Sequence, residues 1–431
     1  MTEHVHRHHH ADMLSVEAAR HRILQAFETL EPVCMKITDA LSLVISEDVY
    51  SSINIPPLNN SAMDGYALRS KDVQSATLTN PVSLRIVGSV PAGHLPDFTI
   101  QSGEAARIMT GAAIPGGADS VVPFEETTES EEFDRSELRD IGIRVPVKPG
   151  GDIRLAGGDV TVDQKVLQSG TIINPSTIAV LASLGRDTIK VYRKPEVAIL
   201  STGDELIEPG LVSEAGKIYD SNTSGLVASV IAAGGIPKPF GIVRDNLSQL
   251  EKKISEAMNS DLVVTSAGVS KGDYDVVKDA LASRGILNFW SIKMRPAKPL
   301  AFGVLNDAQS PKVTPLIGLP GNPVSSMVAF EQFCRPAIRK MLGKSSSLRP
   351  TIKATLTDHI YNHDGRRVYA RVRITNESGS YTATTSGSQE SNVLTSMAYA
   401  DGLAICPEDV SVKGPGESVT VIMLNWPEEM I

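Results

Sequence analysis

The chain has little cysteine, little histidine outside one end, and no long hydrophobic run. Only three cysteines occur among 431 residues, at positions 34, 334 and 406, and no two of them lie close together. This spacing argues against a disulfide framework or a zinc site and fits a reducing cytoplasm. No stretch approaches about 18 consecutive apolar residues, so no transmembrane helix and no membrane partner are predicted.

Histidine is scarce outside the N-terminal segment. Outside the first ten residues only His21, His94, His359 and His363 occur, and none of them lies in a Gly-rich turn. Imidazole catalysis is therefore disfavoured. Residues 1–13 are expected to form a disordered His-rich tail, with weak metal binding as the alternative, and they lack the apolar core of a secretory signal.

Composition is that of a soluble globular protein, with 41% hydrophobic and 21% charged residues. The length predicts about two to four domains. The net charge of −9 argues against nucleic acid as the main partner.

Periodicity changes three times along the chain. Residues 15–30 predict an amphipathic helix capped by Ser15, and short β-branched runs with many turns follow from about 53 to 173. A helix is expected from Pro175, ending at Gly185. Residues 195–342 alternate between strand and helix patterns, which predicts a doubly wound sheet with helices on both faces. After a short linker at 343–347, residues 350–431 return to strands and predict a small barrel or sandwich.

Three turns in the alternating segment follow apolar runs. They are AILSTGDEL (198–206), LVVTSAGVSKGDYD (262–275) and LIGLPGNPVSS (316–326). Open α/β sheets bind ligands at their carboxyl edge, and Gly- and Ser-rich turns let backbone amides approach a phosphate. The polar residues of the first two turns are largely carboxylates, namely Asp204, Glu205, Asp273 and Asp275. This set suits a hard cation that holds an anionic ligand. The alternative for the second turn is an ordinary loop in which Asp275 caps a helix.

A fourth segment, Lys293-Met294-Arg295-Pro296-Ala297-Lys298-Pro299, carries three cations between two expected strands. Its two prolines predict an extended, stiff loop, which favours a fixed anion clamp over a solvated loop. The turns around Asp64 and Thr110 are polar but not diagnostic by themselves.

Taken together, nine motifs occur in a characteristic order: NNSAMDGYAL, RIMTGAAIPGGADSVV, GGDIRLAGGDV, STGDEL, YDSNTSGL, GVSKGDYD, RPAKPLAFG, GLPGNPVSS and SQESNVL. In these motifs the chain resembles the molybdopterin molybdenumtransferase family of the MoeA type, which is also found as the C-terminal domain of gephyrin. The resemblance extends from about residue 14 to 425.

The resemblance implies an α/β plus β multidomain fold. Its parts would be a doubly wound α/β (MogA-like) domain, an inserted β-rich domain, an elongated helical segment and a C-terminal β-barrel. The implied boundaries are 14–52 with 160–190 for the elongated segment, 53–159 for the inserted domain, 191–343 for the α/β domain and 349–431 for the barrel.

The resemblance also implies an activity. Family members are homodimers that bind adenylylated molybdopterin and molybdate between the α/β domain of one subunit and the inserted domain of the other. The adenylate is cleaved with Mg²⁺, molybdenum enters the dithiolene and AMP leaves. Such chemistry needs charge neutralisation more than a protein nucleophile. Implied partners are an upstream molybdopterin adenylyltransferase and, downstream, a molybdoenzyme or nucleotide-transfer protein, all in the cytoplasm.

Site residues are implied by matching motifs. The acids and hydroxyl implied in catalysis are Asp64, Thr110, Asp159, Glu205, Asp245 and Asp275, of which Glu205, Asp245 and Asp275 would bind the metal. The residues implied in binding substrate or anion are Ser266, Gly268, Ser270, Arg295, Lys298, Pro320, Gly321, Asn322, Pro323, Arg371 and Ser391. Arg295 stands where the family commonly has Lys, and its planar fork would hold an oxyanion through two bonds.

Two other functions share the fold. One is a molybdopterin-binding or peptide-scaffold protein without transferase activity, as in the receptor-anchoring domain of gephyrin. The other is a paralogue that handles tungstate or adds a nucleotide. The acids at 64, 205, 245 and 275 favour the enzyme, because a scaffold has no need for all of them.

Overall fold

The computed structural model of the chain describes residues 13–131, 139–212, 215–244, 247–266, 285–307 and 310–425. The chain forms two compact units. The smaller comprises residues 47–169 and 175–187, and the larger comprises the segments up to 46, 170–174 and from 188 onward. Within the described residues, no helix has the length and apolar character needed to cross a membrane. The predicted α/β plus β fold class is confirmed, whereas the finer domain boundaries stay a prediction.

The larger unit contains a six-stranded sheet in the order β15-β12-β16-β20-β19-β17. Its strands are β12 (Glu196–Thr202), β15 (Ile236–Val243), β16 (Leu262–Ser266), β17 (Gly285–Ser291), β19 (Pro299–Asp307) and β20 (Ser310–Leu319). The first four in sheet order run parallel, but β19 is antiparallel to both its neighbours. The connections from β17 to β19 and from β19 to β20 are short, and short connections join antiparallel strands. β19 is therefore the one strand of the six that runs against the others, because β17, antiparallel to β19, points the same way as the first four.

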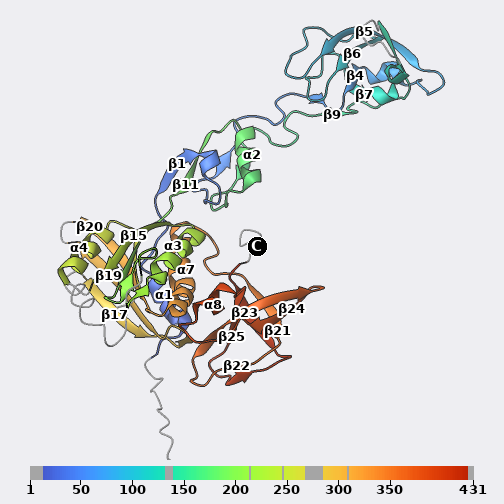
Figure 1. The fold of residues 1–431 in the computed structure, drawn as a ribbon. Coiled ribbons are helices and arrows are strands. Elements are labelled where there is room, and N and C mark those ends of the chain that lie inside the picture. The colour runs from blue at the N-terminus through green and yellow to red at the C-terminus, as the bar shows by residue number, and fades with distance from the viewer. Residues whose placement is uncertain are drawn as a thin grey trace, which may run out of the picture. The chain divides into compact units, whose positions relative to one another are not determined.

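Helices cover both faces of this sheet, as Figure 1 shows: α4 (Leu247–Ala257) lies on one side and α3 (Ser221–Ala233) and α7 (Arg335–Met341) on the other. Leu250 and Ile254 of α4 pack with Leu200, Val263 and Leu316 in a buried core. This apolar contact is what fixes α4 on the sheet.

The first helix, α1 (Val16–Leu24), contacts α7. Ser15 caps it as predicted, because its hydroxyl accepts a bond from Ala18 N at 3.1 Å. The helix ends at Leu24 instead of residue 30. After Leu24 the amides of Ala26 and Phe27 donate to the carbonyl oxygens three residues before them, which forms a tighter turn.

The three strands that precede the predicted turns end at one edge of the sheet. Strands β12, β16 and β20 are adjacent and parallel, and they end at Thr202, Ser266 and Leu319. Ser266 lies opposite both Ser201 and Leu319 in the strand register. The carboxyl ends of the three strands therefore coincide, as the sequence predicted, and the residues of the second turn that follow Ser266 lie outside the described residues.

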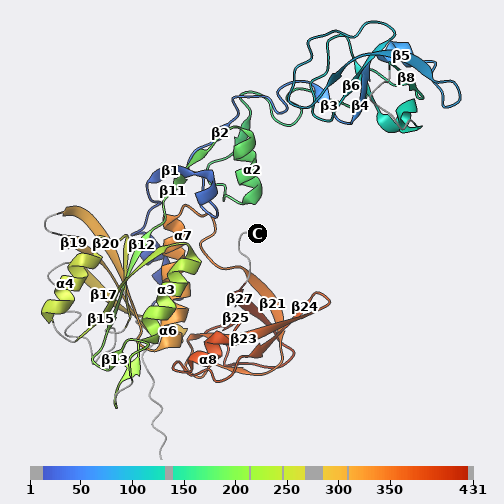
Figure 2. The same cartoon turned by 45° about the horizontal axis from the view of Figure 1, so that its top comes forward.

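The C-terminal strands form a closed barrel, seen in Figure 2 with α8 (Leu394–Ala398) beside it. Its strands are β21 (Thr351–Leu356), β23 (Arg367–Glu377), β24 (Ser380–Thr385), β25 (Gly402–Cys406) and β27 (Ser418–Met423). A ribbon of β22 (Ile360–Tyr361) and β26 (Val412–Lys413) is attached. The short strand β18 (Met294–Arg295) pairs with the start of β23 and so links the cationic loop of the α/β sheet to the barrel.

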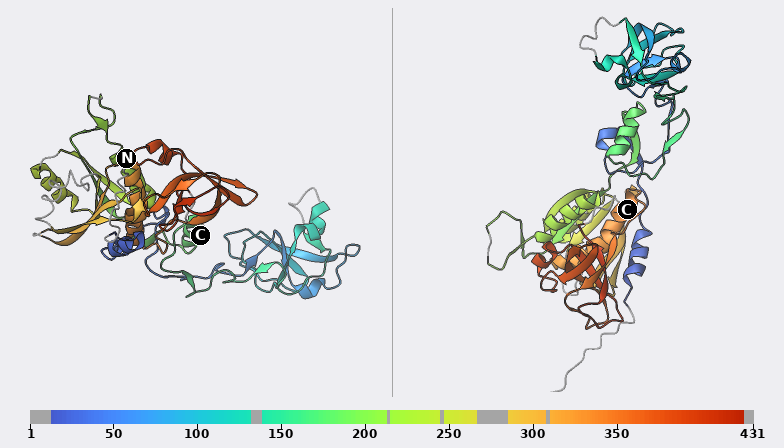
Figure 3. Two further views of the ribbon diagram at one scale, coloured as in Figure 1. Left: turned by 90° about the horizontal axis from the view of Figure 1, so that it is seen from below. Right: turned by 90° about the vertical axis from the view of Figure 1, so that its right-hand side faces the viewer.

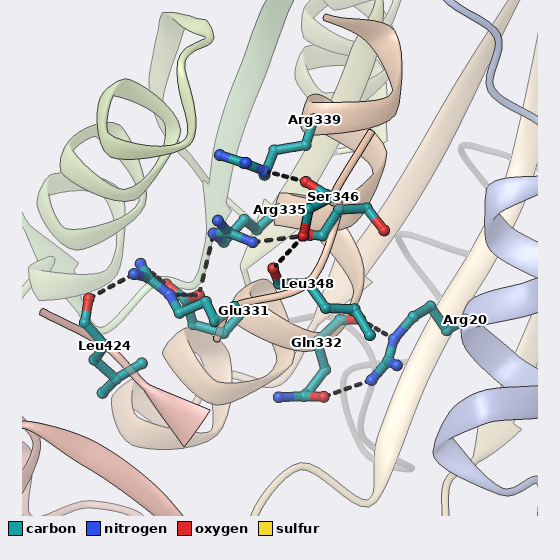
Figure 4. Close-up of polar contacts among 10 residues, drawn as sticks. Arg20, Glu331, Gln332, Arg335, Arg339, Ser346, Leu348 and Leu424 are labelled. Atoms are coloured by element: carbon teal, nitrogen blue, oxygen red, sulfur yellow. Dashed lines mark hydrogen bonds and ion pairs between the residues drawn. The ribbon is translucent and has the colours of Figure 1, made fainter. Parts of the chain in front are cut away.

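The predicted linker after α7 is bound to the helix that precedes it (Figure 4). Arg335 donates to Ser347 O at 2.8 Å and Arg339 to Ser346 O at 2.7 Å. Arg349 then forms two bonds to the Glu331 carboxylate, at 2.6 and 3.1 Å. Glu331 lies in a π-helical turn, Phe330–Cys334, between α6 (Pro323–Ala329) and α7. The connection to the barrel is therefore held in place by hydrogen bonds and an ion pair, and we call this set of contacts the arginine joint.

Shorter ribbons complete the larger unit. They are β1 (Pro32–Lys36) with β11 (Thr188–Tyr192), and β13 (Leu206–Ile207) with β14 (Ile218–Tyr219).

The smaller unit is built on a five-stranded sheet in the order β7-β4-β6-β5-β8, coloured blue to cyan in Figure 3. Its strands are β4 (Gly65–Leu68), β5 (Val82–Val90), β6 (Glu104–Ile108), β7 (Ser120–Pro123) and β8 (Asp140–Ile143). Alternate residues face two separate cores: Tyr66 and Leu68 point to one, and Ala67 to the other.

The remaining elements of the smaller unit are two short ribbons and a helix. β2 (Val49–Tyr50) pairs with β10 (Lys165–Leu167), and β3 (Asn60–Ser61) pairs with β9 (Ile153–Arg154). The helix α2 (Pro175–Ser183) begins at the predicted proline.

Candidate active site

A cavity of about 1060 Å³ lies between the carboxyl edge of the α/β sheet and the barrel. The sheet side is lined from the first turn (Glu205), the end of β16 (Ser266), the start of α3 (Asn222), the loop 295–299 and the third turn (320–323). The barrel side is lined by Asp364, Arg366 and the segment 389–392. The structure thus brings together, in one unit, predicted residues that lie far apart in the sequence.

The cationic loop enters this cavity with Arg295 and Lys298. It is a compact turn and not the extended segment that its prolines predicted. Ile292 N donates to Lys298 O at 2.7 Å, and Ala297 has a positive φ of 72°. The turn is needed because β18 reaches out to pair with the barrel and the chain must then return to start β19. In the described residues, neither cation forms an ion pair within 4 Å.

Arg371 stands behind the cavity wall. Its side chain is 1% exposed and donates to Ser396 Oγ at 3.2 Å, Ser388 O at 2.9 Å and Glu390 O at 3.1 Å. It does not line the cavity itself, although the sequence placed it among the binding residues. Burial, together with the charge of Arg295, lowers the pKa of Arg371 to about 10, so it stays cationic at neutral pH. It positions the loop and adds positive potential.

The barrel contributes one charged pair that sequence reasoning missed. Arg366 donates to Asp364 through Nε at 2.9 Å and reaches Met294 O through Nη1 at 3.2 Å. Burial works against ionisation of Asp364, but the bonds and charge of Arg366, with the charge of Arg295, hold its pKa below the usual value. These residues lie in a barrel turn with no motif, so only the pairing of β18 with β23 reveals them.

The third turn is tied to the barrel loop. Asn322 donates to Ser391 Oγ at 2.8 Å, and Val324 N donates to Ser391 O at 3.3 Å. Pro320 is buried and Pro323 opens α6. Four of the predicted residues, Pro320, Gly321, Asn322 and Pro323, therefore form one wall together with Ser391.

Glu205 presents a carboxylate to the cavity from the first turn. A Cβ built at Gly203 would lie 2.6 to 2.7 Å from both Glu205 carboxylate oxygens, and Gly203 has a φ of 147°. The Glu205 side chain could move away from such a Cβ, but this φ is one that residues with a Cβ rarely adopt, so glycine is favoured here.

In the smaller unit, Asp64 and Thr110 lie in contact. The Asp64 carboxylate accepts from Thr110 N at 2.6 Å and from Thr110 Oγ1 at 2.8 Å. The backbone bond first, and the hydroxyl bond second, hold the pKa of Asp64 below its usual value. Gly65 is required beside it, because a Cβ there would come 2.0 Å from Val122 O. Asp159 is exposed in the same unit, and its amide donates to Ile55 O at 2.9 Å.

Four predicted site residues, Asp245, Gly268, Ser270 and Asp275, lie outside the described residues. The part of the chain that the structure describes holds no cluster of three His, Cys, Asp or Glu side chains able to bind a metal ion. Glu205 nevertheless suits Mg²⁺, which proteins often bind through one or two carboxylates together with substrate phosphates.

Comparison with known proteins covers nearly the whole chain. Residues 14–185 match the family model described as MoeA N-terminal region (domain I and II), residues 198–340 a probable molybdopterin binding domain, and residues 353–424 the MoeA C-terminal region (domain IV).

Full-length relatives agree. "Molybdopterin molybdenumtransferase 2" of Mycobacterium tuberculosis is 35% identical over 416 residues, covering 95% of this chain and 99% of the relative. A "Molybdopterin molybdenumtransferase" of Nostoc is 38% identical over 385 residues, covering 88% and 86%. The crystal structure of a molybdopterin biosynthesis MoeA protein from Pyrococcus horikoshii superposes with a TM-score of 0.80 at 31% identity, covering 96% of this chain and 100% of that one.

Proposed function

The chain belongs to the molybdopterin molybdenumtransferase family, and we propose that it inserts molybdenum into adenylylated molybdopterin with release of AMP. The observation that carries the proposal is the charge pattern of the cavity. Arg295 and Lys298, both half-buried, line it, and among the described residues neither forms an ion pair within 4 Å, while the buried cation Arg371 lies behind the wall. Half-buried cations that form no ion pair, with a buried cation behind them, favour an anionic ligand at this part of the cavity.

Each part of the cavity has a role in this proposal. Arg295 and Lys298 hold molybdate or a phosphate oxygen through charge-assisted hydrogen bonds. Ser391, oriented by Asn322, supplies a neutral donor on the barrel side. These groups stabilise the charge that builds up when the pyrophosphate bond breaks, which is the main catalytic requirement of phosphoryl chemistry.

Mg²⁺ is part of the proposal. Glu205 would hold it with Asp245 and Asp275, and the bound ion would neutralise phosphate charge and orient the adenylate. Glu205 itself lines the cavity.

A homodimer is also proposed, in which the inserted domain of one copy completes the site of the other. Asp64 and Thr110 support this, because they form a preorganised acid and hydroxyl pair on the surface of the smaller unit. The substrate would come from an upstream molybdopterin adenylyltransferase in the cytoplasm, and the product would pass to a molybdoenzyme or nucleotide-transfer protein.

The direct test incubates purified protein with adenylylated molybdopterin, Mg²⁺ and molybdate, and measures AMP and the cofactor formed. We expect both products, and more than about tenfold less of each when Glu205→Gln replaces the wild type under the same conditions. Substrate binding without AMP release would favour the scaffold function instead. A parallel reaction with tungstate that outpaces molybdate would assign the protein to tungsten.

A further inference from the structure

Asn222 joins two turns of the cavity. Its side-chain nitrogen donates to Ser266 Oγ and to Gly321 O, each at 2.7 Å. Ser266 ends β16 and Gly321 follows β20, whereas Asn222 is the second residue of α3. One amide therefore bridges three elements, and all three residues line the cavity.

The backbone that carries Asn222 is held by its neighbours. Asp220, only 4% exposed, caps α3 and accepts from Thr223 N at 2.9 Å and from Thr223 Oγ1 at 2.6 Å. Thr223 Oγ1 also lies 2.7 Å from Ser201 Oγ of β12. The amide of Asn222 thus starts from a fixed point, and little conformational entropy is lost when it bonds.

These contacts decide where the polar hydrogens point. A carbonyl oxygen only accepts hydrogen bonds, so Gly321 O identifies the atom of Asn222 facing it as the nitrogen. The same nitrogen donates to Ser266, and the Ser266 hydroxyl is therefore the acceptor in that bond. Its own hydrogen finds no acceptor among the described residues, although Ser266 is 1% exposed. A buried donor of this kind is expected to have a partner.

We propose that Asn222 is a positioning residue, which fixes the Ser266 hydroxyl as a hydrogen-bond donor to an anionic oxygen of the ligand in the cavity. This inference rests on the proposed function in requiring a phosphate or oxyanion there. Arg295 and Lys298 supply charge to the same cavity, while Ser266 supplies a directional bond. The second bond of Asn222, to Gly321 O, fixes the orientation of the amide that donates to Ser266.

A double-mutant cycle on the full-length protein tests the coupling, with AMP as the probe and calorimetry as the readout. Asn222→Ala and Ser266→Ala should each weaken AMP binding by about tenfold. Because Asn222 acts through Ser266, the double variant should bind no more than about twofold more weakly than Ser266→Ala alone. Ser325 is the matched control, because it also lines the cavity and is 5% exposed. Asn222 does not act through Ser325, so the losses of AMP affinity in Asn222→Ala and Ser325→Ala should multiply in the double variant.

A second measurement does not depend on ligand. The side-chain amide protons of Asn222, assigned by NMR through Asn222→Ala, should shift in the Ser266→Ala variant. If Asn222→Ala folds poorly, Asn222→Asp replaces it: the carboxylate would accept the Ser266 hydrogen, so AMP binding should fall at least as far.

The inference would be overturned if the double variant lost AMP affinity by the product of the two single losses. It would also be overturned if the wild type bound neither AMP nor inorganic pyrophosphate. The two claims can fail separately. If the protein forms the cofactor but the effects of Asn222→Ala and Ser266→Ala on AMP binding are independent, only this inference is wrong. If the two effects are coupled but no cofactor forms, only the proposed transferase activity is wrong.

Discussion

Thr110 donates both its backbone N–H and its hydroxyl to the Asp64 carboxylate, at 2.6 and 2.8 Å. The two residues are 46 positions apart and meet because β4 and β6 pair antiparallel, with Gly65 opposite Ile108. The pair keeps the acid ionised and oriented on an exposed surface, which suits a residue that must face a ligand or a second subunit.

Removing the Thr110 hydroxyl should change the pH dependence of Asp64. The folded pKa of Asp64 is lowered, so its stabilising effect is present above the unfolded value and is lost as pH falls through the folded pKa. Thr110→Val keeps the backbone bond but loses the hydroxyl bond, so the pKa should rise part of the way and the acid limb of activity should move to higher pH. Carboxyl ¹³C titration measures the shift, with Thr110→Ser as control. Identical titrations for Val and wild type would contradict this account.

The proposed dimeric site predicts complementation between two variants of low activity. Asp64→Asn and Glu205→Gln should each release little AMP alone, but after subunit exchange roughly a quarter of all sites should combine intact halves from both copies. AMP formation after mixing measures the recovery. If exchange is verified by mass spectrometry and activity stays absent, each site lies within one copy.

Arg295 should govern the molybdate requirement. Replacing it with Ala would leave the oxyanion without its charged donor and should raise the molybdate concentration for half-maximal turnover about tenfold or more. Arg295→Lys should recover much of the loss, because a point charge still meets the oxyanion. Molybdate titrations at fixed Mg²⁺ and adenylate compare the three proteins. If the titration curves of wild type and Arg295→Ala coincide, the loop does not bind the oxyanion and is an ordinary solvated loop.

Glu205 should act through Mg²⁺. Glu205→Gln should cut AMP release by more than about tenfold, equivalent to over 1.4 kcal/mol of barrier, with the fold intact. Added Mg²⁺ should restore part of the rate, and EDTA should abolish it in the wild type. If neither the substitution nor EDTA changes AMP release, the metal has no role in this reaction.

The arginine joint should contribute to stability. Arg349 and Glu331 are 13% and 11% exposed, so Arg349→Met should lower the free energy of unfolding by about 2–3 kcal/mol. The control is Lys253→Met, which breaks a 3.9 Å pair with 42% and 46% exposure and should cost under about 1 kcal/mol. Chemical denaturation of both variants gives the comparison. Equal losses would show that the joint is no stronger than a surface pair.

Local signals explain why much of this molecule was predictable. The apolar runs before Gly203, Ala267 and Pro320 end in small polar residues, and parallel strands with such ends must present them at one edge. Ser15 as a helix cap and Pro175 as a helix start depend only on neighbouring residues, so they too were predicted correctly.

Relations between distant segments needed the tertiary structure. Sequence alone determined that strands ending in small polar residues would meet at one edge of a sheet, and it predicted that their turns and a cationic loop bind an anionic ligand. Only the fold placed Asp364 and Arg366 beside Arg295, because that neighbourhood comes from two residues of β18 pairing with a barrel strand more than seventy positions away. The fold also put Arg371 behind the cavity wall and made Asn222 a bridge between two turns. Such contacts depend on which way a side chain points after packing, and no local pattern in the sequence encodes that direction.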